Sequence, residues 1–392
     1  MTNRLFLYLV RMNIICKMRF SALLLSVVFV QFSILGQHSA DSEPMLPDSL
    51  KKTVLGAFDG TAPVDDSVRL QYIMTFGSFP DENRVCFSID QQANCCFDIK
   101  VDSLFQTFLS SNVNSYWAYK LYGDFLFKIF EANRFSKSDD AFDVARRMNH
   151  NYSLAWQNGA WDAHSLYALG YFCSLMERYS EAVQWYLKSL EIDASNALVN
   201  YSLGVSFLLD KNSLAAQPYA LNAVSLFADL AQKSDAARIA GITLYENGHF
   251  DTAYRYFSMA DSLSPGYLLN QTFLLRSMLQ QRNDDEAIRM ANTIYEASPH
   301  SPDVADRIYE LFRIANRKEL YLKHVQDMVV LFAKDDEASG NLKFHFGKML
   351  YLAGEQRKAL RMFDQAKVHF KKVLPPNHQV FEALEDMPGH KR

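Results

Sequence analysis

The sequence predicts an all-α protein, a solenoid of helical hairpins with a less regular region on its N-terminal side. The composition is that of a globular chain, with 49% hydrophobic and 21% charged residues, and it holds only 15 glycines and 11 prolines among 392 residues. So few helix breakers, together with many aromatic residues, favour helices over short strands. A segment that recurs along the second half of the chain indicates repeats.

The first 36 residues have the pattern of a secretory signal peptide. Four basic residues and no acidic residue precede the apolar stretch 20–35, and small or polar residues follow it. A positive start, an apolar middle and a small-residue exit are the three parts of such a signal. A membrane anchor is the alternative, although 16 residues interrupted by Gln31 and Ser33 are short for a hydrocarbon core of roughly 30 Å.

We therefore expect export to the periplasm or cell envelope of a Gram-negative bacterium, with secretion as the alternative. Contact with the membrane is expected only if the leader stays uncleaved. Removal of residues 1–36 takes away four basic residues and changes the formal charge from −4 to −8. The mature chain is thus expected to be mildly acidic.

Two segments lie between the leader and the repeats. Residues 37–65 are predicted to be a linker with one short helical piece, and residues 66–160 an N-terminal helical region. Within that region, 84–101 alternates apolar and polar residues on both sides of a polar centre, which predicts a β-hairpin. Helices expected at 114–132 and 139–149 would form a divergent first repeat.

Four cysteines remain after removal of the leader. Cys86 is close enough in sequence to Cys95 and Cys96 for a disulfide in an oxidising compartment, and the sequence leaves the choice between them open. The alternative is that some or all of the four, Cys173 included, are buried free thiols. The spacing lacks the second paired motif of a zinc site.

The recurring segment occurs most clearly at residues 163–193, 235–265 and 340–370. Each copy has a glycine in a first helix, an alanine twelve residues later and an aromatic residue four further on. Two antiparallel helices pack closely where one presents a small residue, and we expect the aromatic ring to fill the space against the next repeat. The three sets are Gly170, Ala182 and Tyr186; Gly241, Ala253 and Phe257; and Gly347, Ala359 and Phe363.

This pattern resembles the tetratricopeptide repeat (TPR) family, whose unit is a helix–turn–helix of 34 residues. The unit starts fall near residues 163, 197, 234, 268, 302 and 340, which gives spacings of 34, 37, 34, 34 and 38 residues. The unit near 302 matches least, because Tyr309 and Tyr321 occupy positions that are usually small. The resemblance implies a repeat array over 161–372, followed by a C-terminal tail at 373–392.

The resemblance also implies a concave face lined by the first helix of each unit. A groove rich in tyrosine suits apolar or extended peptide segments, because tyrosine combines a large rigid surface with a hydroxyl. The alternative is that these aromatic residues pack between neighbouring helices. The basic clamp with which some family members hold a C-terminal carboxylate is not reproduced. The residues predicted to line the partner-binding groove are Tyr167, Tyr171, Tyr201, Arg238, Tyr245, Arg276 and Lys348.

No catalytic motif is present in the sequence. It contains no GxSxG, HExxH or GxxxxGK[ST] segment, its ten histidines are dispersed, and its acidic clusters lack the spacing of a calcium loop. We expect no enzymatic activity, no cofactor and no metal. The scattered basic residues predict no nucleic-acid partner.

The predicted function is that of a protein–protein interaction scaffold with a protein or peptide partner. One alternative is an accessory protein that captures a nutrient or glycan through a site in the N-terminal third. Another is an enzyme whose catalytic residues lie in that third. Repeat folds share an architecture while their partners differ, so the partner stays open.

Overall fold

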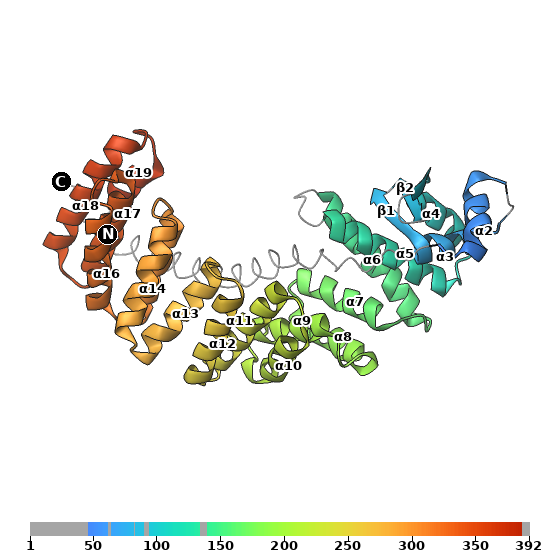
Figure 1. Cartoon of the computed structure of the whole chain (residues 1–392), viewed down its shortest axis with the longest axis horizontal. Helices are drawn as coiled ribbons and strands as arrows, with labels where there is room; N and C mark the ends of the chain where they lie inside the picture. Colours follow the sequence, from blue (N-terminus) through green and yellow to red (C-terminus); the bar gives the residue numbers. More distant parts are fainter. Residues whose placement is uncertain (1–45, 62–63, 82, 90–93, 134–138, 386–392) are drawn as a thin grey trace, which may run out of the picture. The chain divides into compact units, whose positions relative to one another are not determined.

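The computed structural model describes residues 46–61, 64–81, 83–89, 94–133 and 139–385 (Figure 1). The signal peptide predicted for residues 1–36 lies outside these ranges. The chain divides into two compact units, unit 1 ending at Phe227 and unit 2 beginning at Ala228. Within the described ranges, no helix combines the length and the apolar character needed to cross a membrane.

Unit 1 begins with two helices, a small sheet and a third helix. The first helix lies inside the predicted linker and ends at Gly60, whose left-handed φ of 81° stops it. The second begins at Asp65, whose side chain accepts a hydrogen bond from the Ser67 amide. The elements are α2 (Asp48–Asp59), α3 (Asp66–Phe76), β1 (Gly77–Asp81), β2 (Arg84–Ser88), β3 (Asn94–Asp98) and α4 (Val101–Ser111).

The sheet has three antiparallel strands in the order β1-β2-β3, where the sequence predicted a two-stranded hairpin over 84–101. Strands β2 and β3 form a hairpin within that range. Strand β1 was not predicted, because its residues, GSFPD, include glycine and proline and do not alternate apolar with polar. Val101 was expected to end the second strand, but it begins α4.

The register of β2 on β3 decides the disulfide. Cys86 and Cys96 lie directly opposite each other with their Cα atoms 4.0 Å apart, and their sulfur atoms are bonded. Cys95 is opposite Phe87, and successive side chains of a strand point to opposite faces. Strand alternation therefore selects Cys96 over Cys95, which is a free thiol.

Paired helices make up the rest of the described chain (Figure 1). A long pair precedes six hairpins, and a short helix in the predicted tail packs on the last of them. The long pair is α5 (Tyr116–Asn133) and α6 (Asp139–Gln157). The hairpins are α7 (Ala163–Leu175) with α8 (Tyr179–Ile192), α9 (Ala197–Leu209) with α10 (Ser213–Leu226), α11 (Leu230–Glu246) with α12 (Phe250–Leu263), α13 (Leu268–Gln281) with α14 (Asp284–Ala297), α15 (Pro302–Ile314) with α16 (Lys318–Leu331), and α17 (Asp336–Leu352) with α18 (Gln356–Val373), followed by α19 (Gln379–Glu385).

Each of the six hairpins turns through one residue with a positive φ. The distances between these residues along the chain are 34, 37, 34, 34 and 38 residues, the spacings that the sequence predicts. The weakly matching unit near 302 is therefore a hairpin in register with the others. The prediction of an all-α helical-hairpin solenoid is confirmed. The six turn residues are Glu177, Lys211, Gly248, Arg282, Asn316 and Gly354.

The two long spacings have a local cause. Helices α11 and α17 contain 17 residues each, while the other four first helices contain 13 or 14. Both begin about one helical turn before the predicted unit start, because an aspartate caps the N-terminus of each helix. Asp229 accepts a hydrogen bond from the Gln232 amide, and Asp335 accepts one from the Ala338 amide.

Three hairpins close by packing a ring onto a glycine. A Cβ atom added at Gly241 would lie 2.5 Å from the Phe257 ring, and one at Gly347 would lie 2.5 Å from the Phe363 ring. Gly170 has the same relation to Tyr186 at 2.7 Å. The ring thus fills the space left by the glycine of its own hairpin. As expected from the sequence, the Phe257 ring also packs against the next repeat, where it stacks on Phe273 of α13 with the centroids 5.5 Å apart.

Two other helix pairs vary this contact. In α5/α6, Gly123 lies under the Tyr152 ring, so this pair shares the packing of the repeats despite its longer helices. Helix α6 continues to Gln157, well beyond the predicted end at residue 149. In α13/α14, Leu275 occupies the position of the glycine in those three hairpins, and Ala291 occupies the position of their ring. Both residues are fully buried. Exchanging the large and small partners conserves the volume of the crossing.

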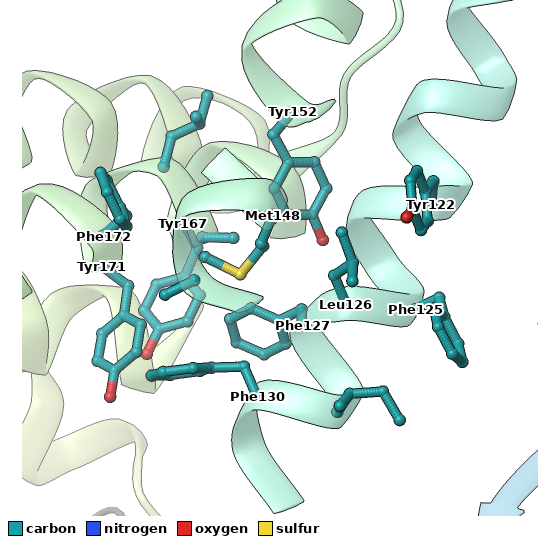
Figure 2. Packing of buried hydrophobic residues seen from close by; sticks show 14 of the residues in the cluster. Tyr122, Phe125, Leu126, Phe127, Phe130, Met148, Tyr152, Tyr167, Tyr171 and Phe172 are labelled. Atoms are coloured by element: carbon teal, nitrogen blue, oxygen red, sulfur yellow. The ribbon is translucent and has the colours of Figure 1, made fainter. Parts of the chain in front are cut away.

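One apolar core runs through unit 1. It connects residues from Leu46 in the N-terminal segment to Leu203 in α9. Figure 2 shows Phe127 and Phe130 of α5 beside Tyr171 of α7, with ring centroids 6.5 and 5.9 Å from that of Tyr171. The boundary between the compact units falls at 227/228, inside the predicted array of 161–372.

Candidate functional site

The first helices of the hairpins carry all seven residues predicted to line a partner-binding groove. Four of them, Tyr167, Tyr171, Tyr201 and Arg238, are buried, with exposed fractions of 5%, 4%, 4% and 0%. The other three, Tyr245, Arg276 and Lys348, are partly exposed and belong to unit 2.

The buried tyrosines of unit 1 pack between helices. The rings of Tyr167 and Tyr171 stack with centroids 6.1 Å apart, and Tyr167 also lies 5.7 Å from the Tyr186 ring of α8. Burial raises the pKa of Tyr167 well above its ordinary value, so its hydroxyl stays protonated. Tyr201 contacts Phe227 at the end of the same unit. These side chains hold neighbouring helices together, as the alternative reading of the sequence proposed.

Arg238 ties α11 to α13. Its Nη2 donates to Asp235 Oδ1 at 2.7 Å, and its Nε donates to Asn270 Oδ1 at 3.0 Å. Its guanidinium also lies over the Tyr267 ring, 5.9 Å from the centroid. Burial raises the pKa of Asp235 to about 6 against the opposing effect of the Arg238 charge. This arginine joins two repeats from the inside and does not reach the surface.

The first of two surface clusters, the Arg276 cluster, joins α11 to α13. Its members are Tyr245, Glu246, Arg276 and Gln280. The Arg276 guanidinium lies 4.3 Å from the centroid of the Tyr245 ring, and its Nη2 is 3.4 Å from Glu246 Oε1. Tyr245 donates its hydroxyl to Gln280 Oε1 at 3.5 Å. The result is a partly exposed aromatic ring with a cation over its face, an arrangement that favours contact with a polar or aromatic ligand.

The Lys348 cluster joins α15 to α17 in a similar way. Its members are Asp306, Tyr309, Phe344, His345 and Lys348. The Lys348 ammonium lies 4.6 Å from the centroid of the Tyr309 ring and 5.8 Å from that of Phe344. It donates to Asp306 Oδ1 at 2.6 Å, and His345 Nε2 lies 3.3 Å from the same oxygen.

Asp306 is ionised in this cluster. Its burial opposes ionisation, but the hydrogen bond from His345 and the charge of Lys348 outweigh that effect. Together they hold the pKa of Asp306 well below its ordinary value. The Lys348 ammonium is therefore neutralised by a fixed carboxylate. Tyr309 and His345 are buried beneath it, with exposed fractions of 1% and 4%, so the partly exposed groups of the cluster are Lys348, Asp306 and Phe344.

The cations of both clusters were predicted from the sequence, but their carboxylate partners were not. Glu246 precedes Arg276 by 30 residues and Asp306 precedes Lys348 by 42, so each pair spans adjacent first helices. An acidic residue about one repeat away from a basic one was the signal available in the sequence. Within the described residues, no group of three His, Cys, Asp or Glu side chains is arranged to hold a metal ion.

Several solved repeat proteins are similar to this chain at low sequence identity. No family model matches the chain, and no curated protein matches it. A tetratricopeptide repeat protein from Parabacteroides merdae is 13% identical, with a TM-score of 0.44, and covers 67% of this chain and 97% of its own. The C-terminal part of a TPR repeat-containing protein from Cytophaga hutchinsonii is 12% identical, with a TM-score of 0.40, and covers 72% and 94%.

A third solved structure, YrrB, is described as a TPR protein with an unusual peptide-binding site. It is 17% identical, has a TM-score of 0.36, and covers 59% of this chain and 96% of its own. The identities and TM-scores are low throughout. The assignment of a tetratricopeptide-like solenoid therefore rests on this chain's own evidence, namely six hairpins in register and the packing of rings onto glycines.

Proposed function

We propose that this protein is an exported, periplasmic scaffold that binds a protein partner through the Arg276 and Lys348 clusters. The observation that carries the proposal is the repetition of one arrangement on two pairs of first helices of unit 2. In each, a cation lies over an aromatic ring and is paired with a carboxylate. Tyrosine and arginine are the residue types that most often dominate binding energy at protein interfaces.

The chemistry of the clusters favours an extended peptide segment of mixed character. Because Glu246 and Asp306 neutralise the two cations, long-range attraction of a strongly charged ligand is small. The partly exposed rings of Tyr245 and Phe344 offer apolar contact, and Gln280 and the Tyr245 hydroxyl offer hydrogen bonds to a peptide backbone.

Two features support export. The first 36 residues have the composition of a signal peptide. The Cys86–Cys96 disulfide suits an oxidising compartment, since thiols stay reduced in the cytosol. Cell fractionation followed by N-terminal sequencing tests this part, and we expect a periplasmic chain that begins near residue 37. A full-length chain in the cytoplasm would contradict it.

Affinity capture from envelope extract tests the binding surface. The bait is the mature chain, and the variant carries Tyr245→Ala, Arg276→Ala and Lys348→Ala. A matched control changes the same residue types on second helices, at Tyr256, Arg289 and Lys323. A partner identified with the bait is then titrated against both variants. We expect the first variant to bind roughly tenfold more weakly or worse, and the control to bind as the original chain does.

Equal binding by the bait and both variants would place the interface elsewhere and contradict the proposal. Tyr167 and Tyr171 are unsuitable probes, because their replacement would leave cavities in the unit 1 core. The alternative function, capture of a small nutrient or glycan by the N-terminal third, is favoured by a single observation. This is an open pocket between α4, α5 and α6.

A further inference from the structure

The pocket between α4, α5 and α6 lies outside the six hairpins and has the size of a small-molecule site. Its volume is about 480 Å³, within the range common for such sites. One wall is apolar and the other polar, with two arginines that project from α6. The lining residues are Gln106, Leu109, Tyr119, Tyr122, Asp143, Arg146, Arg147, His150 and Asn151.

The guanidinium of Arg147 is held in place by groups behind it. Its Nη2 donates to Asp102 Oδ1 and to the Tyr122 hydroxyl. Asp102 also accepts from the Tyr122 hydroxyl at 2.7 Å and from Gln106 Nε2 at 2.7 Å. Burial and the Asp102 carboxylate raise the pKa of Tyr122, so its hydroxyl remains a donor. The network connects α4, α5 and α6 and fixes the orientation of one arginine.

Part of this guanidinium remains available to a ligand. Only Nη2 is used by the network, and Nε and Nη1 make no hydrogen bond to the described residues. The side chain is 35% exposed and lines the pocket. Both bidentate edges of a guanidinium include Nη2, so the open Nε–H and Nη1–H groups can each donate to a single carboxylate oxygen. Such preorganisation lowers the entropy lost when a ligand binds.

The charges around the pocket cancel, which disfavours a ligand with several negative charges. The lining contains two cations, Arg146 and Arg147, and one carboxylate, Asp143. The Asp143 carboxylate accepts a hydrogen bond from Arg146 at 2.6 Å. A second carboxylate, Asp102, supports Arg147 from behind. Two cations and two carboxylates leave no excess positive charge for a dianion such as phosphate. A single carboxylate adds half the charge of a dianion, and the open donors of Arg147 are the groups that can compensate it.

The other lining residues indicate the chemical character of the rest of the ligand. Leu109 and the Tyr119 ring provide an apolar wall, while His150 and Asn151 add polar groups on the α6 side. This combination suits a small molecule with a C–H face and several hydroxyl or amide groups. We infer that the pocket binds a small organic monocarboxylate, and that Arg147 receives its carboxylate group. Sugar acids and the carboxyl ends of peptides share this chemistry.

Calorimetric titration of the purified chain with five probes tests the inference and separates the two sources. The probes are galacturonate, its neutral counterpart galactose, N-acetyl-trialanine with a free carboxyl end, the same peptide as an amide, and inorganic phosphate. We expect saturable binding of galacturonate or of the free peptide, at least tenfold tighter than the matching neutral compound. The carboxylate that binds more tightly identifies the source.

Variants assign the contact to Arg147. Arg147→Lys keeps the charge but loses the Nε–H and Nη1–H donors, and we expect at least tenfold weaker binding of the carboxylate with helicity unchanged. Arg289→Lys, on exposed α14, is the matched control and should bind as the original chain does. If Arg147→Lys does not fold, Arg146→Gln is tested instead. The Arg146 side chain is 61% exposed, so this substitution should leave the fold intact, and we expect severalfold weaker binding of the carboxylate.

Three results would overturn the inference. One is equal binding of a carboxylate and its neutral counterpart, and another is tighter binding of phosphate than of either carboxylate. The third is the absence of binding by both carboxylates at millimolar concentration, which would leave Arg147 with the structural role of joining three helices. None of these results bears on the Arg276 and Lys348 clusters, so the proposed scaffold function is tested separately.

Discussion

Units 1 and 2 are both built largely from helix pairs, but they are stabilised in different ways. In unit 1, one apolar cluster connects the N-terminal helices, the sheet, the α5/α6 pair and the first hairpins, and a disulfide closes the β2–β3 hairpin. In unit 2, buried polar side chains such as Arg238, Asn270 and His324 lie between repeats, and a separate small cluster covers the C-terminal end.

This difference shows two ways in which an array of helices can be stabilised. Unit 2 depends on contacts between neighbouring repeats, as expected for a solenoid whose stability is a sum over units and their interfaces. Unit 1 depends on contacts between residues far apart in sequence, because its small sheet cannot be stable alone. Changes in unit 1 should therefore affect the whole unit, and changes in unit 2 mainly the adjacent repeats.

The largest expected effect comes from the glycine–ring contact of α11/α12. Gly241→Leu should lower the free energy of unfolding by about 3 kcal/mol or more, because even a Cβ there would lie 2.5 Å from the Phe257 ring. Adding Phe257→Ala recreates the Leu275–Ala291 arrangement of α13/α14 and should recover part of the loss. Urea unfolding measures both, and hydrogen exchange should locate the change in the repeats around α11.

A double variant that loses the sum of the two single effects would contradict this account. The ring and the glycine would then be independent, and their contact would not set the spacing of the hairpin. Phe257→Ala alone is the reference for the cavity, with an expected cost of roughly 3–5 kcal/mol.

Removal of the disulfide tests the non-local character of unit 1. Replacing Cys86 and Cys96 with alanine should cost roughly 2–3 kcal/mol, since the bond closes a loop of ten residues in the unfolded chain. Hydrogen exchange should increase across unit 1 and stay unchanged in unit 2. Cys95→Ser is the control, because this thiol is free. Faster exchange confined to β2 and β3 would indicate that the sheet is not coupled to the helices.

Lowering the pH should destabilise unit 2 through protonation of His324. Burial lowers its pKa to about 3, while an unfolded histidine titrates near 6.5. The stability that this neutral ring contributes is present above the unfolded pKa and is lost as the pH falls towards 3. Between pH 7 and pH 5 the loss amounts to about 2 kcal/mol. His324→Gln should remove that part of the pH dependence in urea unfolding.

Asp235 acts in the opposite direction over part of the same range. Burial raises its pKa to about 6, so the stability linked to its protonated form is present below its unfolded pKa and lost as the pH rises through 6. The effects of Asp235 and His324 overlap in a single curve of stability against pH. The contribution of His324 is therefore obtained from the difference between the His324→Gln variant and the original chain. If His324→Gln has the same pH dependence as the original chain, the histidine does not titrate as its burial implies.

The smallest effects concern the hairpin turns. Arg282 has a φ of 59°, a conformation that favours glycine, so Arg282→Gly should stabilise by about 0.5 kcal/mol once the entropy of the unfolded glycine is included. Gly248→Ala, at φ 81° in open space, should destabilise by about 1 kcal/mol. Thermal melting measures both. Stabilisation by both substitutions would show that the turns relax away from the left-handed conformation.

Most of the repeat architecture was predictable because its signals are local. Gly241 and Phe257 are 16 residues apart, and two short helices joined by a tight turn bring such positions together wherever they occur. The β1 strand had no such signal, since its place is set by pairing with β2. The candidate clusters were half predictable: the pattern identified Arg276 and Lys348, but not the carboxylates that neutralise them.

The sequence by itself determined the class of fold, the number of hairpins and their register, because small and aromatic residues at set offsets act within one helical pair. Only the tertiary structure decided which side chains of the first helices stay exposed. Tyr171 and Tyr245 both lie on first helices, yet the rings of α5 pack on the first while the second lies under Arg276 and is partly exposed. Burial depends on what neighbouring elements bring to a position, and that information is distributed over the whole chain.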